Sequence, residues 1–247
     1  MNKLPHITLC FWIMKICATT LGETAGDLLS MTMNIGYGAS SLILITLFLF
    51  SVVTQLLSKK HHPLLYWTVI VSTSTAGTTM SDYMDRTLGL GYAKGSLILI
   101  AILLTVFVYW RASAHSLSVE NIKTSKVELL YWIAILFSNT LGTALGDFLA
   151  DDSGLGFGGG AILVGGLLAL VVVPTWYTKI SKVFLFWIAF VLTRPFGATM
   201  GDVLTKSHEK GGLDFGTIGA SAVLATILGI FLVFSAFNQN RQTENTL

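Results

Sequence analysis

The sequence predicts an all-α membrane protein, a single transmembrane domain over residues 1–247 with eight transmembrane helices. The first reason is composition, because 53% of the residues are hydrophobic and only 11% are charged, whereas soluble domains carry about 25% charged residues. The second reason is an internal repeat, in which each of four copies contains two apolar runs long enough to cross a bilayer. Lipid is therefore the expected solvent, and the small net charge of +2 gives no support for a nucleic-acid partner.

A tryptophan marks each copy of the repeat. It follows an aromatic residue and precedes a glycine by ten residues and an aspartate by fifteen. The four sets are Phe11, Trp12, Gly22 and Asp27; Tyr66, Trp67, Gly77 and Asp82; Tyr131, Trp132, Gly142 and Asp147; and Phe186, Trp187, Gly197 and Asp202. The two other tryptophans, Trp110 and Trp176, lack the aspartate, so the pattern is not a general property of tryptophans in this chain.

Each repeat is predicted to form a helix, a glycine-rich turn and a second helix. The repeats cover about 6–58, 63–112, 127–177 and 181–237. Their first helices are expected at about 6–29, 63–84, 127–149 and 181–203, and their second helices at about 39–58, 95–112, 158–177 and 215–237. Glycines between the two helices favour tight turns. In the fourth copy this turn is three residues longer.

Two spans per repeat return the chain to the same side of the membrane, so the four hairpins are expected to be parallel. Lys15 interrupts the first apolar run, and that run recurs, which favours a retained helix over a signal peptide. Basic residues predict that both termini are cytoplasmic. One side carries Lys3, Lys59, Lys60, Arg111, Lys123, Lys126, Lys179, Lys182 and Arg241, and the other only Arg86, Lys94, Lys206 and Lys210. Trp110 and Trp176 fit an aromatic belt on the cytoplasmic side.

One face of the first helices is polar, at positions 3, 7, 11 and 15 after the tryptophan. Positions four apart share a helix face, so we call this face the polar column. Its polar members are Lys15, Thr19, Glu23, Asp27, Ser74, Thr78, Asp82, Asn139, Thr143, Asp147, Arg194 and Asp202. Such a face is expected to avoid lipid, and a neighbouring edge of small residues suits close packing. The first helices should therefore form the inner layer.

These residues are the candidate substrate- or ion-binding site. The four aspartates are candidate metal ligands because hard cations prefer oxygen, although each can instead cap its glycine-rich turn. No repeated basic residue is expected to compensate them. Glu23 and Arg194 occur once each, and we expect them, with Lys15, to form a charge-compensated cluster at mid-depth. Lys15 can alternatively extend toward the cytoplasm.

The aromatic–tryptophan pairs, the glycine-rich turns and the G-x-x-x-G-D segments beginning at Gly22, Gly142 and Gly197 resemble bacterial membrane proteins built from the domain-of-unknown-function 347 repeat. Ser81 departs from that pattern, because it replaces the second glycine. The resemblance covers nearly the whole chain and implies a bacterial inner-membrane protein. It implies no binding or catalytic residue.

The leading hypothesis is a cation transporter, with a divalent metal favoured, whose pathway runs through the polar column between the first helices. The four aspartates are expected near its outer mouth. One alternative is a carrier for a small organic or anionic solute that binds Arg194 and Lys15. Another is a non-transporting scaffold or sensor, which uses the polar column only to join helices. No nucleophile–base motif, HExxH segment or cofactor signature is present, so neither an enzyme nor a cofactor is expected. The expected partners are the lipid bilayer and a small cation or solute. The sequence does not decide whether the protein forms a homo-oligomer.

Overall fold

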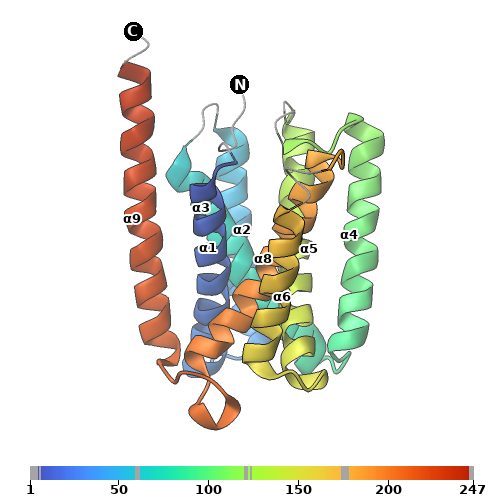
Figure 1. Cartoon of the computed structure of the whole chain (residues 1–247), viewed down its shortest axis with the longest axis vertical. Helices are drawn as coiled ribbons and strands as arrows, with labels where there is room; N and C mark the ends of the chain where they lie inside the picture. The colour runs from blue at the N-terminus through green and yellow to red at the C-terminus, as the bar shows by residue number, and fades with distance from the viewer. Residues whose placement is uncertain are drawn as a thin grey trace.

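The computed structural model describes residues 5, 7–58, 62–119, 122, 124–173 and 178–244, with the side chains of 172 and 236–244 left out. These residues form eight long helices and no strand (Figure 1). The inner helices are α1 (Leu9–Asp27), α3 (Pro63–Asp82), α5 (Ser125–Asp147) and α8 (Lys182–Thr205). The outer helices are α2 (Tyr37–Leu57), α4 (Tyr92–Ala114), α6 (Gly156–Val172) and α9 (Gly216–Glu244). The predicted all-α fold is confirmed.

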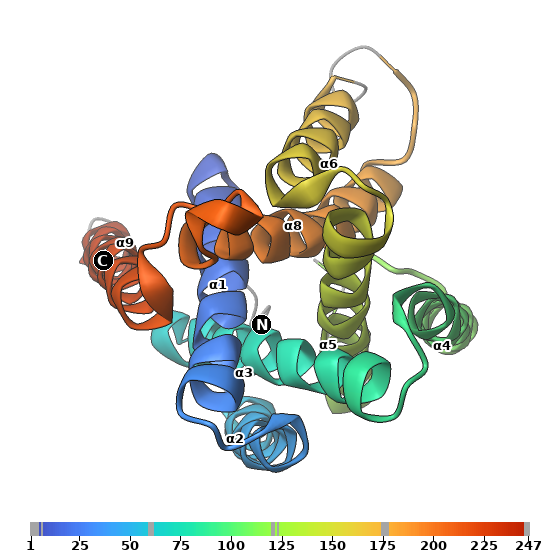
Figure 2. The ribbon, with the colours of Figure 1, turned by 90° about the horizontal axis from the view of Figure 1, so that it is seen from below.

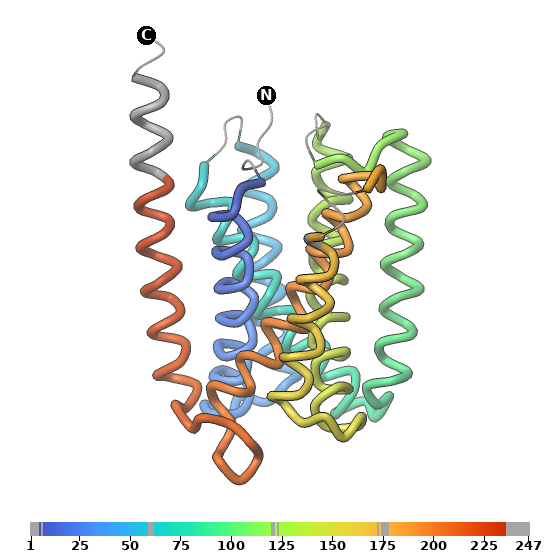
Figure 3. The backbone as a smooth tube through the Cα atoms, viewed as in Figure 1, coloured from blue at the N-terminus to red at the C-terminus, as the bar shows by residue number. Residues whose placement is uncertain are grey.

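The two ends of the bundle differ. We call the end where α1 begins and α9 ends the terminal end, and the opposite end, where the glycine-rich turns lie, the turn end (Figure 3). Three inner helices continue past their aspartate as one turn of π-helix, namely η1 (Leu28–Thr32), η2 (Tyr83–Thr87) and η4 (Phe148–Asp152). The fourth instead leads into a loop with the 3₁₀ turn η5 (His208–Lys210). A glycine with positive φ immediately precedes α2 and α4 (Gly36, Gly91) and is the first residue of α6 and α9 (Gly156, Gly216), a conformation that other residues rarely adopt.

The inner helices form a closed ring in which α1 packs on α3, α3 on α5, α5 on α8, and α8 back on α1 (Figure 2). Their inner position follows from their polarity and is visible in their burial. Within its most apolar stretch, α5 is 72% buried, whereas α4 and α9 are each 17% buried. The prediction that the first helices of the repeats form the inner layer is therefore confirmed.

Each outer helix packs on the inner helix of the following repeat. Helix α2 lies on α3, α4 on α5, and α6 on α8, while α9 of the last repeat lies on α1 of the first (Figure 2). The contact between the last repeat and the first is therefore of the same kind as the contacts between consecutive repeats. The four repeats consequently form one cyclic assembly rather than a row with two open ends.

Glycines allow the inner helices to approach closely. The glycine ten residues after each tryptophan lies against the residue seven after the tryptophan in the next repeat. These pairs are Gly22 with Ser74, Gly77 with Asn139, Gly142 with Arg194, and Gly197 with Thr19. A Cβ added to any of these glycines would come within 3.0 Å of its partner residue, so the small-residue edge sets the spacing of the ring.

The repeated aromatic residues form a second ring, which we call the aromatic girdle, at the terminal end. In each case the aromatic residue of one repeat contacts the tryptophan of the next. The centroid distances are 5.7 Å for Phe11–Trp67, 5.5 Å for Tyr66–Trp132, 6.1 Å for Tyr131–Trp187 and 5.7 Å for Phe186–Trp12. These distances are typical of favourable aromatic pairs. The repeated tryptophans therefore serve packing between repeats.

The predicted aromatic belt is wrong for Trp110. This side chain is fully buried and packs edge-to-face on Tyr131 and Trp187, because α4 lies on α5 rather than facing lipid there. Several residues used to predict the belt and the orientation lie outside the described residues or have no described side chain, namely Trp176, Lys3, Lys59, Lys60, Lys123 and Arg241. The orientation stays a prediction.

The exterior of the bundle has the character of a membrane protein. Five of the described helices (α2, α4, α5, α8 and α9) are long and apolar enough to cross a bilayer, and α6 is apolar but shorter. The other two, α1 and α3, carry a series of serines and threonines in addition to their part of the polar column, which lowers their hydropathy. These polar groups are buried against other helices, so the helices need no polar solvent. The chain is a multi-pass membrane protein.

Candidate functional site

An ion pair lies inside the ring of inner helices. Arg194 of α8 places Nη2 3.0 Å from Oε2 of Glu23 on α1. The arginine is fully buried and the glutamate is 3% exposed. Each of these two residues occurs in only one repeat, and the structure brings them together as expected.

Threonines from the other two inner helices complete this cluster. Arg194 Nη2 donates to Oγ1 of Thr78 on α3 and to Oγ1 of Thr143 on α5, the latter at 2.7 Å. The two hydroxyls also lie 3.3 Å and 3.4 Å from Glu23 Oε2. Each inner helix thus contributes one side chain to a single hydrogen-bonded group, which we call the central cluster.

A substitution within the repeat creates the space for the arginine. Glu23, Thr78 and Thr143 occupy the same position, eleven residues after their tryptophans, and α8 has Ala198 there. Arg194 starts one turn nearer the terminal end, and its long side chain reaches the level of the other three. The small alanine therefore lets one helix supply a guanidinium at the position where the others supply oxygen.

Two basic residues bridge the four aspartates in pairs. Lys206 Nζ lies 2.8 Å from Asp27 Oδ2 and 3.1 Å from Asp202 Oδ1. Arg86 lies 3.0 Å from Asp82 through Nε and 3.2 Å from Asp147 through Nη2. We call these two groups the lysine clamp and the arginine clamp. All four aspartates are at most 3% exposed.

The expectation that no repeated basic residue compensates the aspartates is wrong. Arg86 and Lys206 each follow an aspartate by four residues, in the second and fourth repeats, and i,i+4 residues adjoin on a helix. The first and third repeats have Met31 and Asp151 at that position. The sequence signal was a period of two repeats, which is not apparent when all four copies are treated as equivalent.

The four aspartates pair with the basic residues of the clamps and do not cap the glycine-rich turns. They accept no backbone N–H hydrogen bond among the described residues. Burial lowers the pKa of Lys206, but the carboxylates of Asp202 and Asp27 outweigh this effect and hold the pKa above its usual range. The lysine is therefore a stable counter-charge. Arg86 further donates to Tyr37 Oη at 3.3 Å, which fixes its side chain from the outer layer.

Three carboxyl groups converge inside the ring, one from the central cluster and one from each clamp. One oxygen each of Glu23, Asp147 and Asp202 lie within 4.8 Å of one another, and all three residues are buried. Asp27 and Asp82, the other two predicted metal ligands, are not part of this acidic triad. The triad belongs to three different inner helices and thus depends on closure of the ring.

The charges of this region do not balance. Glu23 and the four aspartates supply five acidic groups, whereas Arg194, Arg86 and Lys206 supply three basic groups. If all eight groups are ionised, the clamps and central cluster carry an excess of two negative charges. The buried ammonium of Lys15, nearer the terminal end of the ring, would offset one of them. Such an excess is costly in a membrane interior unless a positively charged ligand or protons offset it.

The residues nearer the terminal end are arranged differently from the prediction. Lys15 does not join Glu23 and Arg194. Its Nζ lies over the Phe190 ring, 4.1 Å from the centroid, and has no hydrogen-bond partner among the described residues. It does not extend to a surface either, because its side chain is fully buried.

The candidates seven residues after the tryptophans form contacts between adjacent helices. Thr19 Oγ1 donates to the Thr193 carbonyl at 3.1 Å, and Asn139 Nδ2 donates to Thr73 Oγ1 at 3.0 Å. Ser74 is buried against Gly22, and its hydroxyl has no hydrogen-bond partner in the described part of the chain. These three residues therefore contribute to the ring interfaces, while Thr78 and Thr143 belong to the central cluster.

Comparison with known proteins gives one type of match. The family model described as Repeat of Unknown Function (DUF347) matches four times in tandem, over residues 10–61, 65–116, 130–181 and 185–240. No curated protein and no solved structure matches the chain.

Proposed function

The chain belongs to the family built from the DUF347 repeat, and we propose that it is a membrane transporter for a small cation, with a divalent metal favoured. The acidic triad of Glu23, Asp147 and Asp202 would bind the cation. The excess of acidic over basic groups in the clamps and central cluster is the observation that carries this proposal. We place the protein in the bacterial inner membrane with both termini in the cytoplasm.

The triad has the chemistry and spacing that a hard cation requires. Ca²⁺ binds oxygens at about 2.3–2.6 Å, so two ligands of one ion lie at most about 5 Å apart. Oxygens of the triad fall within 4.8 Å of one another, which is compatible with one shared ion. An ion of charge +2 would also offset the two unbalanced negative charges, whereas a monovalent ion would offset one.

The surrounding groups suggest how passage could be controlled. The basic residues of the clamps, Arg86 and Lys206, lie at the turn end of the triad, and the aromatic girdle lies at the terminal end of the ring. We propose that the cation enters past the clamps and leaves only when the girdle opens. Glu23 is the proposed coupling residue, because it belongs to both the triad and the central cluster, where Arg194 competes with the cation for the same carboxylate.

Cation binding and transport test the proposal directly. Purified protein would be titrated with Mn²⁺, Mg²⁺, Ca²⁺ and Zn²⁺ by calorimetry, and proteoliposomes would be assayed for uptake of the same ions. Asp147→Asn is expected to weaken binding and uptake at least tenfold. Asp151→Asn is the matched control, because Asp151 is exposed and lies outside the triad. Equal binding by the wild type, Asp147→Asn and Glu23→Gln would refute the proposed site.

An anionic solute is the second candidate substrate. Two buried donors favour it, because Lys15 Nζ and Arg194 Nε have no hydrogen-bond partner among the described residues. Uptake of a labelled carboxylate or phosphate that Lys15→Met abolishes, without any cation dependence, would favour this carrier. If neither cations nor anions bind or move, the role that remains is a scaffold or sensor, in which the clamps and central cluster only join helices.

A further inference from the structure

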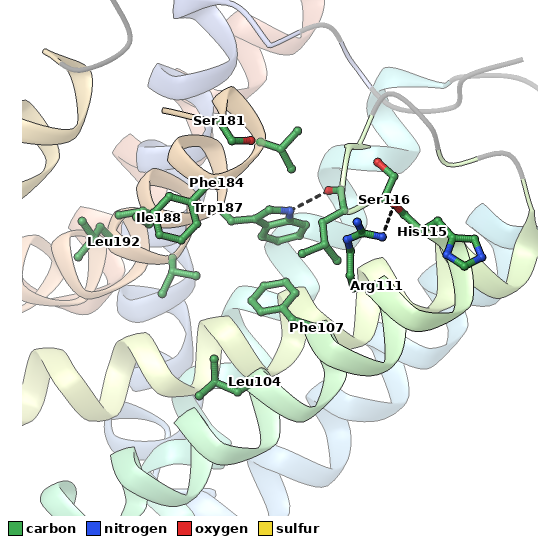
Figure 4. Close-up of a pocket in the computed structure, with 13 residues that line it drawn as sticks. Leu104, Phe107, Arg111, His115, Ser116, Ser181, Phe184, Trp187, Ile188 and Leu192 are labelled. Atoms are coloured by element: carbon green, nitrogen blue, oxygen red, sulfur yellow. Dashed lines mark hydrogen bonds between the residues drawn. The ribbon is translucent and has the colours of Figure 1, made fainter. Parts of the chain in front are cut away.

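A groove lies on the outside of the ring, between α4 and α8 near the terminal end (Figure 4). Its volume is about 670 Å³, within the range of about 300–1,000 Å³ that is typical of ligand pockets. Leu104 and Phe107 of α4 form one wall, and Phe184, Ile188 and Leu192 of α8 lie opposite. Leu104 is 58% exposed and Phe184 is 59% exposed, so the groove opens to the surrounding lipid.

A break in the internal symmetry shapes this groove. The second and third tryptophans of the repeat are 65 residues apart, whereas the other neighbouring pairs are 55 apart, so the chain between α4 and α5 is longer. Part of this connection folds against α8, where the Leu117 carbonyl accepts a 2.9 Å bond from Trp187 Nε1 (Figure 4). The connection thereby closes the terminal end of the groove, a feature that the repeat pattern alone does not specify.

The closed end is polar, in contrast to the apolar walls. Arg111, His115 and Ser116 line it. Arg111 lies in the last turn of α4, where its Nη1 donates to the His115 carbonyl. Its side chain is exposed, so the remaining guanidinium N–H groups can bind an anion. Since α4 ends here, this cationic end lies where a spanning helix meets the lipid headgroups.

We propose that the groove binds an anionic phospholipid, with the phosphate at Arg111 and one acyl chain along the apolar walls. Charge complementarity supports this occupant, because one guanidinium at the polar end of an apolar groove matches a lipid with one net negative charge. Basic pockets between transmembrane helices commonly bind anionic headgroups. An apolar small molecule would leave the cationic end unused, and a free phosphate would leave the walls unused. The proposal is independent of cation transport.

Lipid retention by the full-length protein tests this site. The protein would be purified in a mild detergent, incubated with phosphatidylglycerol or phosphatidylcholine of identical acyl chains, and examined by native mass spectrometry. We expect the wild type to retain phosphatidylglycerol about fivefold better, the factor that one basic residue near an anionic surface supplies. Arg111→Gln is expected to abolish this preference.

Two further variants separate the groove from general effects. Leu104→Trp would fill the groove from an exposed position, so we expect it to reduce retention of both lipids. Lys126→Gln removes a positive charge at the same end but outside the groove, where Lys126 lies over the Tyr109 ring, so it should keep the preference. Equal retention of both lipids by the wild type, or an unchanged preference in Arg111→Gln, would overturn the proposal. So would loss of the preference in Lys126→Gln, since it would indicate attraction by total charge alone.

Discussion

Removing either partner of the central ion pair is expected to destabilise the protein, but by different amounts. Glu23→Gln leaves four acidic and three basic groups in the region of the clamps and central cluster, so the buried excess falls from two negative charges to one. Arg194→Gln leaves five acidic and two basic groups, so the excess rises to three. The arginine variant should therefore be the less stable one.

The magnitudes follow from burial and from the groups that remain. Breaking a buried pair and leaving its partner uncompensated costs about 3–5 kcal/mol, and we expect a loss in that range for Arg194→Gln. In Glu23→Gln, Arg194 keeps its bonds to Thr78 and Thr143 and remains close to other acids. The loss should then be about 1–3 kcal/mol, as for one impaired buried polar contact.

The free energy of unfolding would be measured in mixed micelles at neutral pH by titration with a denaturing detergent, with helix content as the readout. Lys182→Gln is the control for charge removal, because Lys182 is exposed at the start of α8, and should change stability by at most about 0.5 kcal/mol. The double variant should lose less than the sum of the two single losses. A loss for Glu23→Gln that equals or exceeds that for Arg194→Gln would refute the charge count.

Three other variants test the ring and its clamps in the same unfolding assay. Gly142→Ala should lose about 1–3 kcal/mol by overpacking against Arg194, whereas Gly166→Ala, which has open space around it, should gain up to about 1 kcal/mol; equal effects would contradict the close approach. Trp132→Ala should lose about 3–5 kcal/mol, because it opens a cavity in the girdle, and a loss below about 1 kcal/mol would contradict this. Because the folded pKa of Lys206 lies above its ordinary value of 10.5, its contribution is complete below that value and is lost only as pH rises through the folded pKa. The stability difference between wild type and Lys206→Gln should therefore be constant from pH 6 to 9, and a difference that changes over this interval would indicate another titrating group.

The layers of this fold were predictable because charge is costly in lipid. Residues such as Glu23 and Asp147 share one helix face with the other polar positions, so that face must turn inward. The glycine edge then indicated which side of each helix makes close contact. These arguments depend only on spacing within a helix and required no knowledge of neighbouring helices.

The details of the candidate site depended on neighbours that spacing does not reveal. The sequence pattern indicates only that Arg86 and Lys206 are charges near the ends of spans, whereas the structure shows that they bridge aspartates of adjacent repeats. The small side chain of Ala198 explains the position of Arg194 only when the structure shows that this arginine faces Glu23, Thr78 and Thr143 of the other inner helices. Lys15 was grouped with Glu23 by sequence depth, yet the structure places it on the Phe190 ring.

The closure of the last repeat on the first has a consequence for how the chain assembles during synthesis. Of the eight described helices, α1 is synthesised first and its partners α8 and α9 last, so one side of α1 contacts lipid or a chaperone until they insert. Because each inner helix begins and each outer helix ends at the terminal end (Figure 1), the position of the chain break is not dictated by the ring itself. A circularly permuted gene that begins at the second repeat and joins the old ends by a linker would encode a protein with the same helix contacts. Its helices would be synthesised in a different order.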